Sequence, residues 1–347
     1  MNEAYNNGKY TIAEKQQMFP HLFNSLSVVI PVLSSTFASV GRFLKHAGNM
    51  SLGMLIIDES GQAVPQSALG AIYRTRRAVV VGDPLQVEPV VTIPKVLIDI
   101  LADSTCVANA YKVIENSVQT FSDNINEFNG MIGERQVGCP LVVHRRCIEP
   151  MFSISNLISY DNRMFNKTNK KEEYLKPENL FLIKKSGWIN VEGEENGGKD
   201  HFVKNQAERV CQLMEDAVHI YSDLFETDDK IFIITPFRTV AESMRKFIIS
   251  YFSVKGYDKQ ILSKWTKNCV GTVHTFQGKD ANEVLLVLGC SNKSTGAMNW
   301  VVKKANILNV ACTRAKYRIA FIGNINDWKN RRYFREFIPS FIDIINV

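Results

Sequence analysis

The sequence predicts an α/β fold built on parallel β-sheets, and two patterns support this prediction. Short, continuously apolar runs alternate along the chain with amphipathic stretches of helical length. Continuous apolarity is typical of strands that are covered on both faces, as the strands of parallel sheets are. The chain has 347 residues, which is long enough for two domains with separate hydrophobic cores.

The first series of elements precedes a stretch with three glycines at residues 130–138. Pro65 suits the first turn of a helix, and Gly82-Asp83-Pro84 is a turn signal that ends a strand. We expect strands at residues 27–33, 54–57 and 78–81. We expect helices at residues 37–46, 65–73 and over most of 97–128.

The second series follows that stretch, so we predict two domains, residues 1–133 and 134–347. Thr235-Pro236 stops one of the later strands. Residues 166–185 are polar and predict a loop, and residues 191–199 are rich in glycine and predict a flexible turn. We expect strands at 231–234, 284–288 and 319–322, and helices at 148–160, 205–221 and 240–252.

The composition narrows the class of protein. The net charge is +6 and the pI is about 8.8, which permits a polyanionic partner without demanding one. None of the seven cysteines has CxxC spacing, and no cysteines and histidines form a zinc pattern. Free thiols in a reducing cytosol are therefore expected, and with them a cytoplasmic protein. The polar N-terminus has no apolar core of a secretory signal, and no apolar run approaches a membrane span.

Two adjacent carboxylates, Asp58 and Glu59, follow a predicted apolar strand. Ligands of open α/β sheets bind at the carboxyl ends of the strands. One carboxylate there can hold Mg²⁺ through water, and the next can orient or deprotonate an attacking water. A surface acidic pair at a strand end is the alternative interpretation.

Several later residues suit phosphate chemistry. Gln86 follows the next predicted strand, where it can contact a γ-phosphate or simply cap a turn. Arg146 and Arg314 stand in short polar windows, and a guanidinium binds phosphate through a fixed fork of donors, although either arginine alone is more often a surface residue. Small and hydroxylated residues at 270–280 allow a close approach to phosphate or ribose, and His274 alone is more often structural.

Together and in this order, these runs resemble the motifs of superfamily 1B DNA/RNA helicases, in the Upf-like branch. Asp58-Glu59-Ser60-Gly61-Gln62 resembles motif II, with Ser60 where alanine is commoner, and Gly82-Asp83-Pro84-Leu85-Gln86 resembles motif III. His144-Arg145-Arg146 resembles the following arginine motif. Residues 275–280 resemble motif V, with Asp280 where glutamate is usual. Residues 309–316 resemble motif VI.

The resemblance implies two RecA-like parallel-sheet domains that bind ATP and single-stranded DNA or RNA. Asp58 would serve Mg²⁺, Glu59 the hydrolytic water, and Gln86, Arg146 and Arg314 the γ-phosphate. The same resemblance assigns nucleotide contacts to Gln277, Gly278 and Asp280. It assigns nucleic-acid contacts to Ser34, Ser35, Thr36, Thr272 and His274.

The phosphate loop of such an enzyme is missing from the 347 residues. The three Gly-Lys pairs precede Tyr10, Asp200 and Asp280, so none fits G-x-x-x-x-G-K-[ST]. We therefore expect a carboxy-terminal portion of a helicase with an incomplete first domain, which does not hydrolyse ATP alone. A separate upstream polypeptide with the loop would complete it. A non-catalytic nucleic-acid-binding or regulatory module, or a decayed remnant, are the alternatives.

Overall fold

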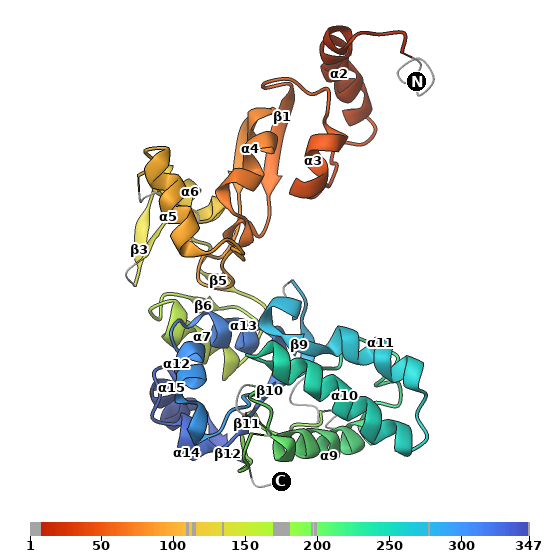
Figure 1. Cartoon of the computed structure of the whole chain (residues 1–347), viewed down its shortest axis with the longest axis vertical. Coiled ribbons are helices and arrows are strands. Elements are labelled where there is room, and N and C mark those ends of the chain that lie inside the picture. The colour runs from red at the N-terminus through yellow and green to blue at the C-terminus, as the bar shows by residue number, and fades with distance from the viewer. Residues whose placement is uncertain are drawn as a thin grey trace. The chain divides into compact units, whose positions relative to one another are not determined.

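The computed structural model describes residues 8–108, 111–112, 116–133, 135–168, 181–195, 197, 200–276 and 278–345. The chain divides into two compact units (Figure 1). Unit 1 comprises Met1–Met131 and Gln136–Cys139, and unit 2 comprises Ile132–Arg135 and Pro140–Val347. Both units have mixed α/β structure, as the sequence predicted.

Unit 1 contains a small parallel sheet of two strands, β1 (Leu52–Ile57) and β2 (Thr75–Val80), with Ile56 opposite Val79. Pro65 starts helix α4 (Pro65–Tyr73), and the side chain of Ser117 caps the start of helix α6 (Val118–Ile125). Its elements are α2 (Ile12–Ser27), α3 (Phe37–Phe43), β1 (Leu52–Ile57), α4 (Pro65–Tyr73), β2 (Thr75–Val80), α5 (Lys95–Ser104), α6 (Val118–Ile125), and the short strands β3 (Gly130–Ile132) and β4 (Arg135–Val137).

The two faces of this sheet differ. Ile57 packs with Ala68 of α4 and Val118 of α6 in a buried cluster. Side chains on the other face of the sheet remain largely exposed, with Ile56 at 66% and Val79 at 44%. An uncovered apolar face is unusual for a parallel sheet.

The strand predicted at residues 27–33 is wrong. Helix α2 runs to Ser27, and residues 28–36 form neither helix nor strand. The helix is set by a capping box, in which Thr11 and Glu14 bond each other's backbone amides. The amide of Ile30 still donates to Leu26 O at 2.8 Å, so the apolar run begins as a continuation of the helix. A strand also needs a partner, and the described strands of unit 1 pair only as β1 with β2 and β3 with β4.

Unit 2 is built on a six-stranded parallel sheet with the order β12-β7-β11-β10-β8-β9. All five residues of β8 are buried, which explains its continuously apolar sequence. The strands are β7 (Gly187–Asn190), β8 (Ile231–Thr235), β9 (Val270–Thr272), β10 (Ala281–Val287), β11 (Ala315–Gly323) and β12 (Asp343–Ile344).

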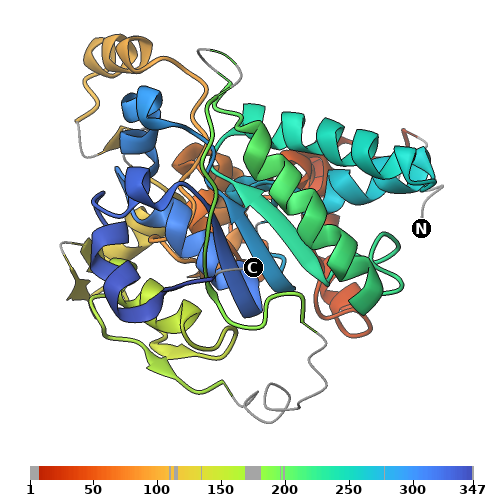
Figure 2. The same cartoon turned by 90° about the horizontal axis from the view of Figure 1, so that it is seen from below.

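Helices cover both faces of this sheet (Figure 2). Helices α9 (Lys204–Ile220), α10 (Arg238–Val254) and α11 (Lys259–Cys269) lie on one side. On the other side lie α7 (Met151–Ser159), α13 (Asn306–Arg314) and α15 (Phe334–Phe341), where α7 contacts both α13 and α15. The unit also contains two short helices, α12 (Thr295–Val301) and α14 (Ile325–Trp328), and a short parallel pair of strands, β5 (Val143–His144) and β6 (Phe165–Asn166).

Most other predicted elements are confirmed, with ends that differ by a few residues. The helix predicted at 65–73 has those bounds, and the predicted strands at 231–234, 284–288 and 319–322 are β8, β10 and β11. The region 97–128 holds two separate helices, α5 and α6. Residues 169–180 of the predicted loop lie outside the described residues. No helix in the described ranges is long and apolar enough to cross a membrane.

Candidate functional site

The two carboxylates of the first candidate motif lie at the carboxyl end of β1. Asp58 and Glu59 are both exposed. Glu59 has a left-handed backbone with φ 52°, and its amide donates to Asp58 Oδ1 at 2.9 Å. The side chain of Gln62 donates from Nε2 to Glu59 Oε2 at 2.8 Å. Both carboxylates are thus held at the sheet edge and remain open to solvent.

The loop after β2, which carries Gln86, is joined to the same end of the sheet. The amide of Val81 donates to Ile57 O at 2.8 Å, and the amide of Ser60 donates to Val81 O at 3.0 Å. Gly82 is required here, because a Cβ would lie 2.6 Å from Ser60 Oγ and 2.9 Å from its amide nitrogen. Gln86 Nε2 donates to Asp83 Oδ2 at 2.7 Å. The backbone therefore brings the Asp58-Glu59 turn and the Gln86 loop together.

A buried polar chain, which the sequence did not reveal, supports this junction. Ser60 is fully buried, and its hydroxyl donates to Gln119 Oε1 at 2.5 Å and lies 2.9 Å from Val81 O. Gln119 Nε2 donates to Asp123 Oδ1 at 2.8 Å, and that oxygen also accepts the amide of Gly138 at 3.1 Å. Polar residues four apart on the amphipathic helix α6 are the one signal that could have indicated it.

The hydroxyl segment Ser34, Ser35 and Thr36 is exposed and leads into α3. The Thr36 hydroxyl donates to Ser39 Oγ at 3.3 Å, and the Ser35 hydroxyl lies 3.4 Å from Thr36 O. Because the strand predicted before this segment is absent, the three hydroxyls are presented by an extended segment rather than by a strand end.

In unit 2, the candidate phosphate arginine Arg314 is 2% exposed at the end of α13. Its Nη1 donates to Phe276 O at 3.2 Å and to Lys279 O at 3.0 Å, and its Nε lies 3.4 Å from Val310 O. The guanidinium therefore joins the motif VI helix to the loop that resembles motif V.

The loop between η3 (Val273–Phe276) and β10 carries the candidate nucleotide contacts. Asp280 Oδ1 accepts from Lys316 Nζ at 2.7 Å, with both side chains partly exposed. Gly278 has φ +71°, a left-handed conformation that glycine adopts without strain. Gln277 lies outside the described residues.

The candidate Arg146 is partly buried in the segment after β5 (Val143–His144). The amide of Ile148 donates to Lys316 O at 3.4 Å, so this segment lies beside the start of β11. Burial, followed by the positive charge of Arg146, lowers the pKa of His144. Unit 2 thus brings together the segments that carry Arg146, Arg314 and Asp280.

The two remaining candidates flank β9. Thr272 is the last residue of β9 and is partly buried, and His274 follows in η3 and is exposed. The structure leaves the His274 imidazole accessible, whereas most neighbouring apolar side chains of η3 are buried.

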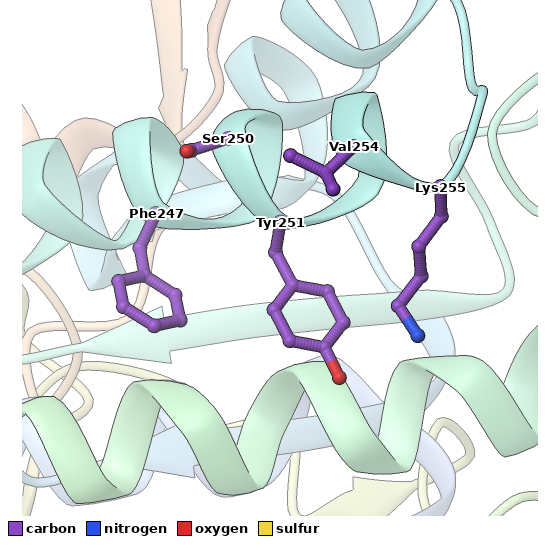
Figure 3. Close-up of a pocket in the computed structure, with 5 residues that line it drawn as sticks. All are labelled: Phe247, Ser250, Tyr251, Val254 and Lys255. Carbon is purple, nitrogen blue, oxygen red and sulfur yellow. The ribbon is translucent and has the colours of Figure 1, made fainter.

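A shallow pocket on α10 contains none of these candidates. It is lined by Phe247, Ser250, Tyr251, Val254 and Lys255 (Figure 3). Tyr251 and Lys255 point toward α9, where Lys255 forms an ion pair with Glu215. This pocket lies where α10 packs beside α9, and its lining residues form no cluster of catalytic groups.

Comparisons with known proteins identify the class. Two family models, each described as an AAA domain, match residues 2–93 and 127–326. Mouse probable helicase senataxin is 22% identical over 328 residues, which are 91% of this chain and 11% of that protein. An uncharacterized ATP-dependent helicase of Methanocaldococcus jannaschii is 24% identical over 344 residues, covering 95% of this chain and 44% of that protein.

A plant relative and a viral structure are also similar. The regulator of nonsense transcripts 1 homolog of Arabidopsis thaliana is 25% identical over 82% of this chain and 21% of that protein. Arterivirus nonstructural protein 10, a helicase solved with DNA, aligns over 82% of this chain and 42% of its own, with 12% identity and a TM-score of 0.37.

The model for residues 127–326 covers more than half of the chain, so the chain belongs to this AAA domain family. Its homologues are superfamily 1 helicases of the Upf1-like group. The chain spans less than half the length of these curated relatives.

Proposed function

We propose that this chain provides the part of an ATP-dependent nucleic-acid helicase or translocase that runs from motif II to motif VI. The observation that carries the proposal is the junction in unit 1. There Asp58, Glu59 and Gln86 lie in the loops that follow two adjacent parallel strands, and backbone hydrogen bonds of Val81 with Ile57 and Ser60 join these loops. Strand ends of open α/β sheets are where nucleotide phosphates and Mg²⁺ bind.

In this proposal each residue has a definite role. Asp58 binds Mg²⁺, Glu59 orients and deprotonates the attacking water, and Gln86 contacts the γ-phosphate. Arg146 and Arg314 stabilise charge on the transferring phosphoryl group. Nucleotide contacts come from Gln277, Gly278 and Asp280.

Single-stranded DNA or RNA is the proposed track. The hydroxyls of Ser34, Ser35 and Thr36 are exposed and can donate to phosphate oxygens, as can Thr272. His274 is exposed beside Thr272 and offers a ring for stacking or a donor for phosphate. We assign residues 1–133 and 134–347 as the two RecA-like domains.

The 347 residues contain no phosphate loop, so no backbone nest or lysine is available for the β- and γ-phosphates. We therefore propose that this chain does not hydrolyse ATP until another polypeptide segment supplies that loop. The exposed apolar face of the β1–β2 sheet, which includes Ile56 and Val79, supports this view, because a further strand and its covering elements would bury such a face.

The test is a steady-state ATPase assay of the purified chain with single-stranded DNA and with RNA. The chain alone and its Glu59→Gln variant should both give background rates. A mixture of the chain with the product of the adjacent upstream coding region should gain activity that Glu59→Gln abolishes. Turnover by the chain alone that depends on Glu59 would refute the proposed need for a second segment.

The lack of a phosphate loop favours one alternative, a non-catalytic module that binds single strands. It predicts salt-sensitive binding of an oligonucleotide, measured by fluorescence anisotropy, that ATP does not alter even in the mixture. Activity in the mixture would exclude it.

A further inference from the structure

Three potential metal ligands meet in unit 2, in a cluster that contains none of the candidate helicase residues. Glu195, His201 and Cys290 each offer one donor atom, and these atoms lie within 4.8 Å of one another. His201 Nδ1 is 3.1 Å from Glu195 Oε2. Cys290 follows the carboxyl end of β10, whereas Asp280 directly precedes the first residue of that strand.

Backbone contacts hold these ligands together. The amide of Cys290 donates to His201 O at 2.9 Å. Gly289 permits this approach, because a Cβ there would lie 2.7 Å from the same oxygen. The amide of Ser291 donates to Glu195 Oε1 at 2.7 Å, and the hydroxyl of Ser294 donates to Glu195 Oε2 at 2.9 Å. The segment after β10 and the turn before α9 therefore fix the cluster without needing an ion.

The three ligands differ in their exposure to solvent. Cys290 is 2% exposed, and among the described residues its thiol takes part in no hydrogen bond. The Glu195 side chain is 7% exposed and His201 is 22% exposed, so the imidazole gives access from solvent.

We propose that Glu195, His201 and Cys290 bind one Zn²⁺ ion. Sulfur, imidazole nitrogen and carboxylate oxygen are the donors that Zn²⁺ takes in proteins. One thiolate and one carboxylate neutralise its two positive charges, which favours binding in a largely buried place. With metal–ligand bonds of about 2.0–2.3 Å, tetrahedral donors lie roughly 3.3–3.6 Å apart, so shifts of about 1 Å close the site.

Binding changes the protonation of two ligands. The ion takes the place of the proton between His201 Nδ1 and Glu195 Oε2, and the imidazole carries its proton on Nε2 instead. The Cys290 thiol releases its proton to solvent. A water or the Ser294 hydroxyl fills the fourth position. The bound ion would cross-link the turn before α9 to the segment after β10.

Zinc titration of the purified, metal-free chain tests the proposal. Competition with a chromophoric zinc chelator should give about one equivalent bound, and Co²⁺ in its place should give a thiolate-to-cobalt charge-transfer band. Cys290→Ser should lose that band and bind Zn²⁺ at least about tenfold more weakly. Cys211→Ser is the matched control, because Cys211 is buried on α9 outside the cluster, and it should bind as the wild type does.

Absence of zinc binding by the wild type, or equal binding by Cys290→Ser, would overturn the proposal and leave a histidine–carboxylate hydrogen bond beside a buried thiol. If Cys290→Ser does not fold, His201→Gln and Glu195→Gln decide the question, because both ligands are nearer the surface. Each folded variant should bind Zn²⁺ at least about tenfold more weakly than the wild type. Wild-type affinity in both would also overturn the proposal.

Discussion

Glu283 is a buried carboxyl group whose titration should control the pH dependence of unit 2. It is fully buried in β10, and its two oxygens accept the amides of Leu182 and Ile183 at 2.7 and 2.6 Å. The Tyr221 hydroxyl donates to Oε1 at 2.8 Å. Burial outweighs these hydrogen bonds and raises the pKa of Glu283 to about 7.

The direction of the effect follows from proton linkage. Because the pKa is higher in the folded state than the usual value of 4.5, protonation favours the folded protein. The contribution of Glu283 is complete below the unfolded pKa and is lost as the pH rises through the folded pKa. Between pH 5 and pH 7 this loss amounts to about 2 kcal/mol of unfolding free energy.

Urea unfolding of the wild type and of Glu283→Gln at pH 5 and pH 7 measures this change. Tryptophan fluorescence reports on unit 2, because all four tryptophans lie there: Trp188, Trp265, Trp300 and Trp328. Glutamine does not titrate, so the stability difference between wild type and variant should shrink by about 2 kcal/mol from pH 5 to pH 7.

The matched control is Glu208→Gln, since Glu208 is a glutamate of α9 with an exposed side chain. Its stability difference from the wild type should change by less than about 0.5 kcal/mol over the same range. A Glu283→Gln variant whose stability varies with pH as the wild type's does would refute the reasoning, because Glu283 would then not titrate in this window.

Three further substitutions test the two units. Ser60→Ala should destabilise unit 1 by about 1–3 kcal/mol, because the buried Gln119 oxygen loses its donor. Amide hydrogen exchange in β1 and β2 measures this loss, and protection factors equal to those of the wild type would contradict it. Arg314→Lys should destabilise unit 2 by about 1–3 kcal/mol, because one ammonium group cannot replace the hydrogen bonds of the guanidinium to Phe276 O and Lys279 O. Tryptophan fluorescence during urea unfolding measures the change, and a loss under about 0.5 kcal/mol would contradict the prediction. Ile56→Thr should change stability by less than about 0.5 kcal/mol and reduce aggregation in light scattering, whereas a larger loss would mean that this face is covered.

The pattern of apolar residues predicted a strand correctly where the structure provides neighbouring strands for it. The run 231–234 is apolar at every position because β8 has covered faces and neighbours on both sides, and the prediction holds. The run 27–33 is largely apolar, but it includes Ser27 and Pro31 and has no described strand beside it, so it does not form a strand. A sequence pattern describes one segment, whereas a strand depends on the segment that pairs with it.

The sequence predicted the candidate residues that belong to a motif, but not the residues that support them through packing. The sequence pattern predicted Asp58 at the end of a strand and Gln86 just past the next one; in the structure Asp58 directly follows β1, and Gln86 lies in the loop six residues after β2. The support of Ser60 by Gln119 was not predictable, since the two residues are far apart in sequence and meet only through packing of α6. The Glu195, His201 and Cys290 cluster escaped detection for the same reason, because zinc patterns are recognised by short spacings.

For Arg314 the sequence and the structure indicate different roles. The motif that it belongs to implies phosphate binding, whereas in the structure its side chain is buried and bonded to the backbone. Its guanidinium donates to the carbonyl oxygens of Phe276 and Lys279. Hydrogen bonds from a charged group contribute about 1.5–3 kcal/mol each, so reaching a phosphate would require these bonds to be exchanged rather than added. A bidentate contact with a phosphate would provide two charge-assisted hydrogen bonds in exchange. Nucleotide binding at Arg314 would then release the loop before β10 from α13, and the loop carrying Asp280 would be free to change position with the nucleotide.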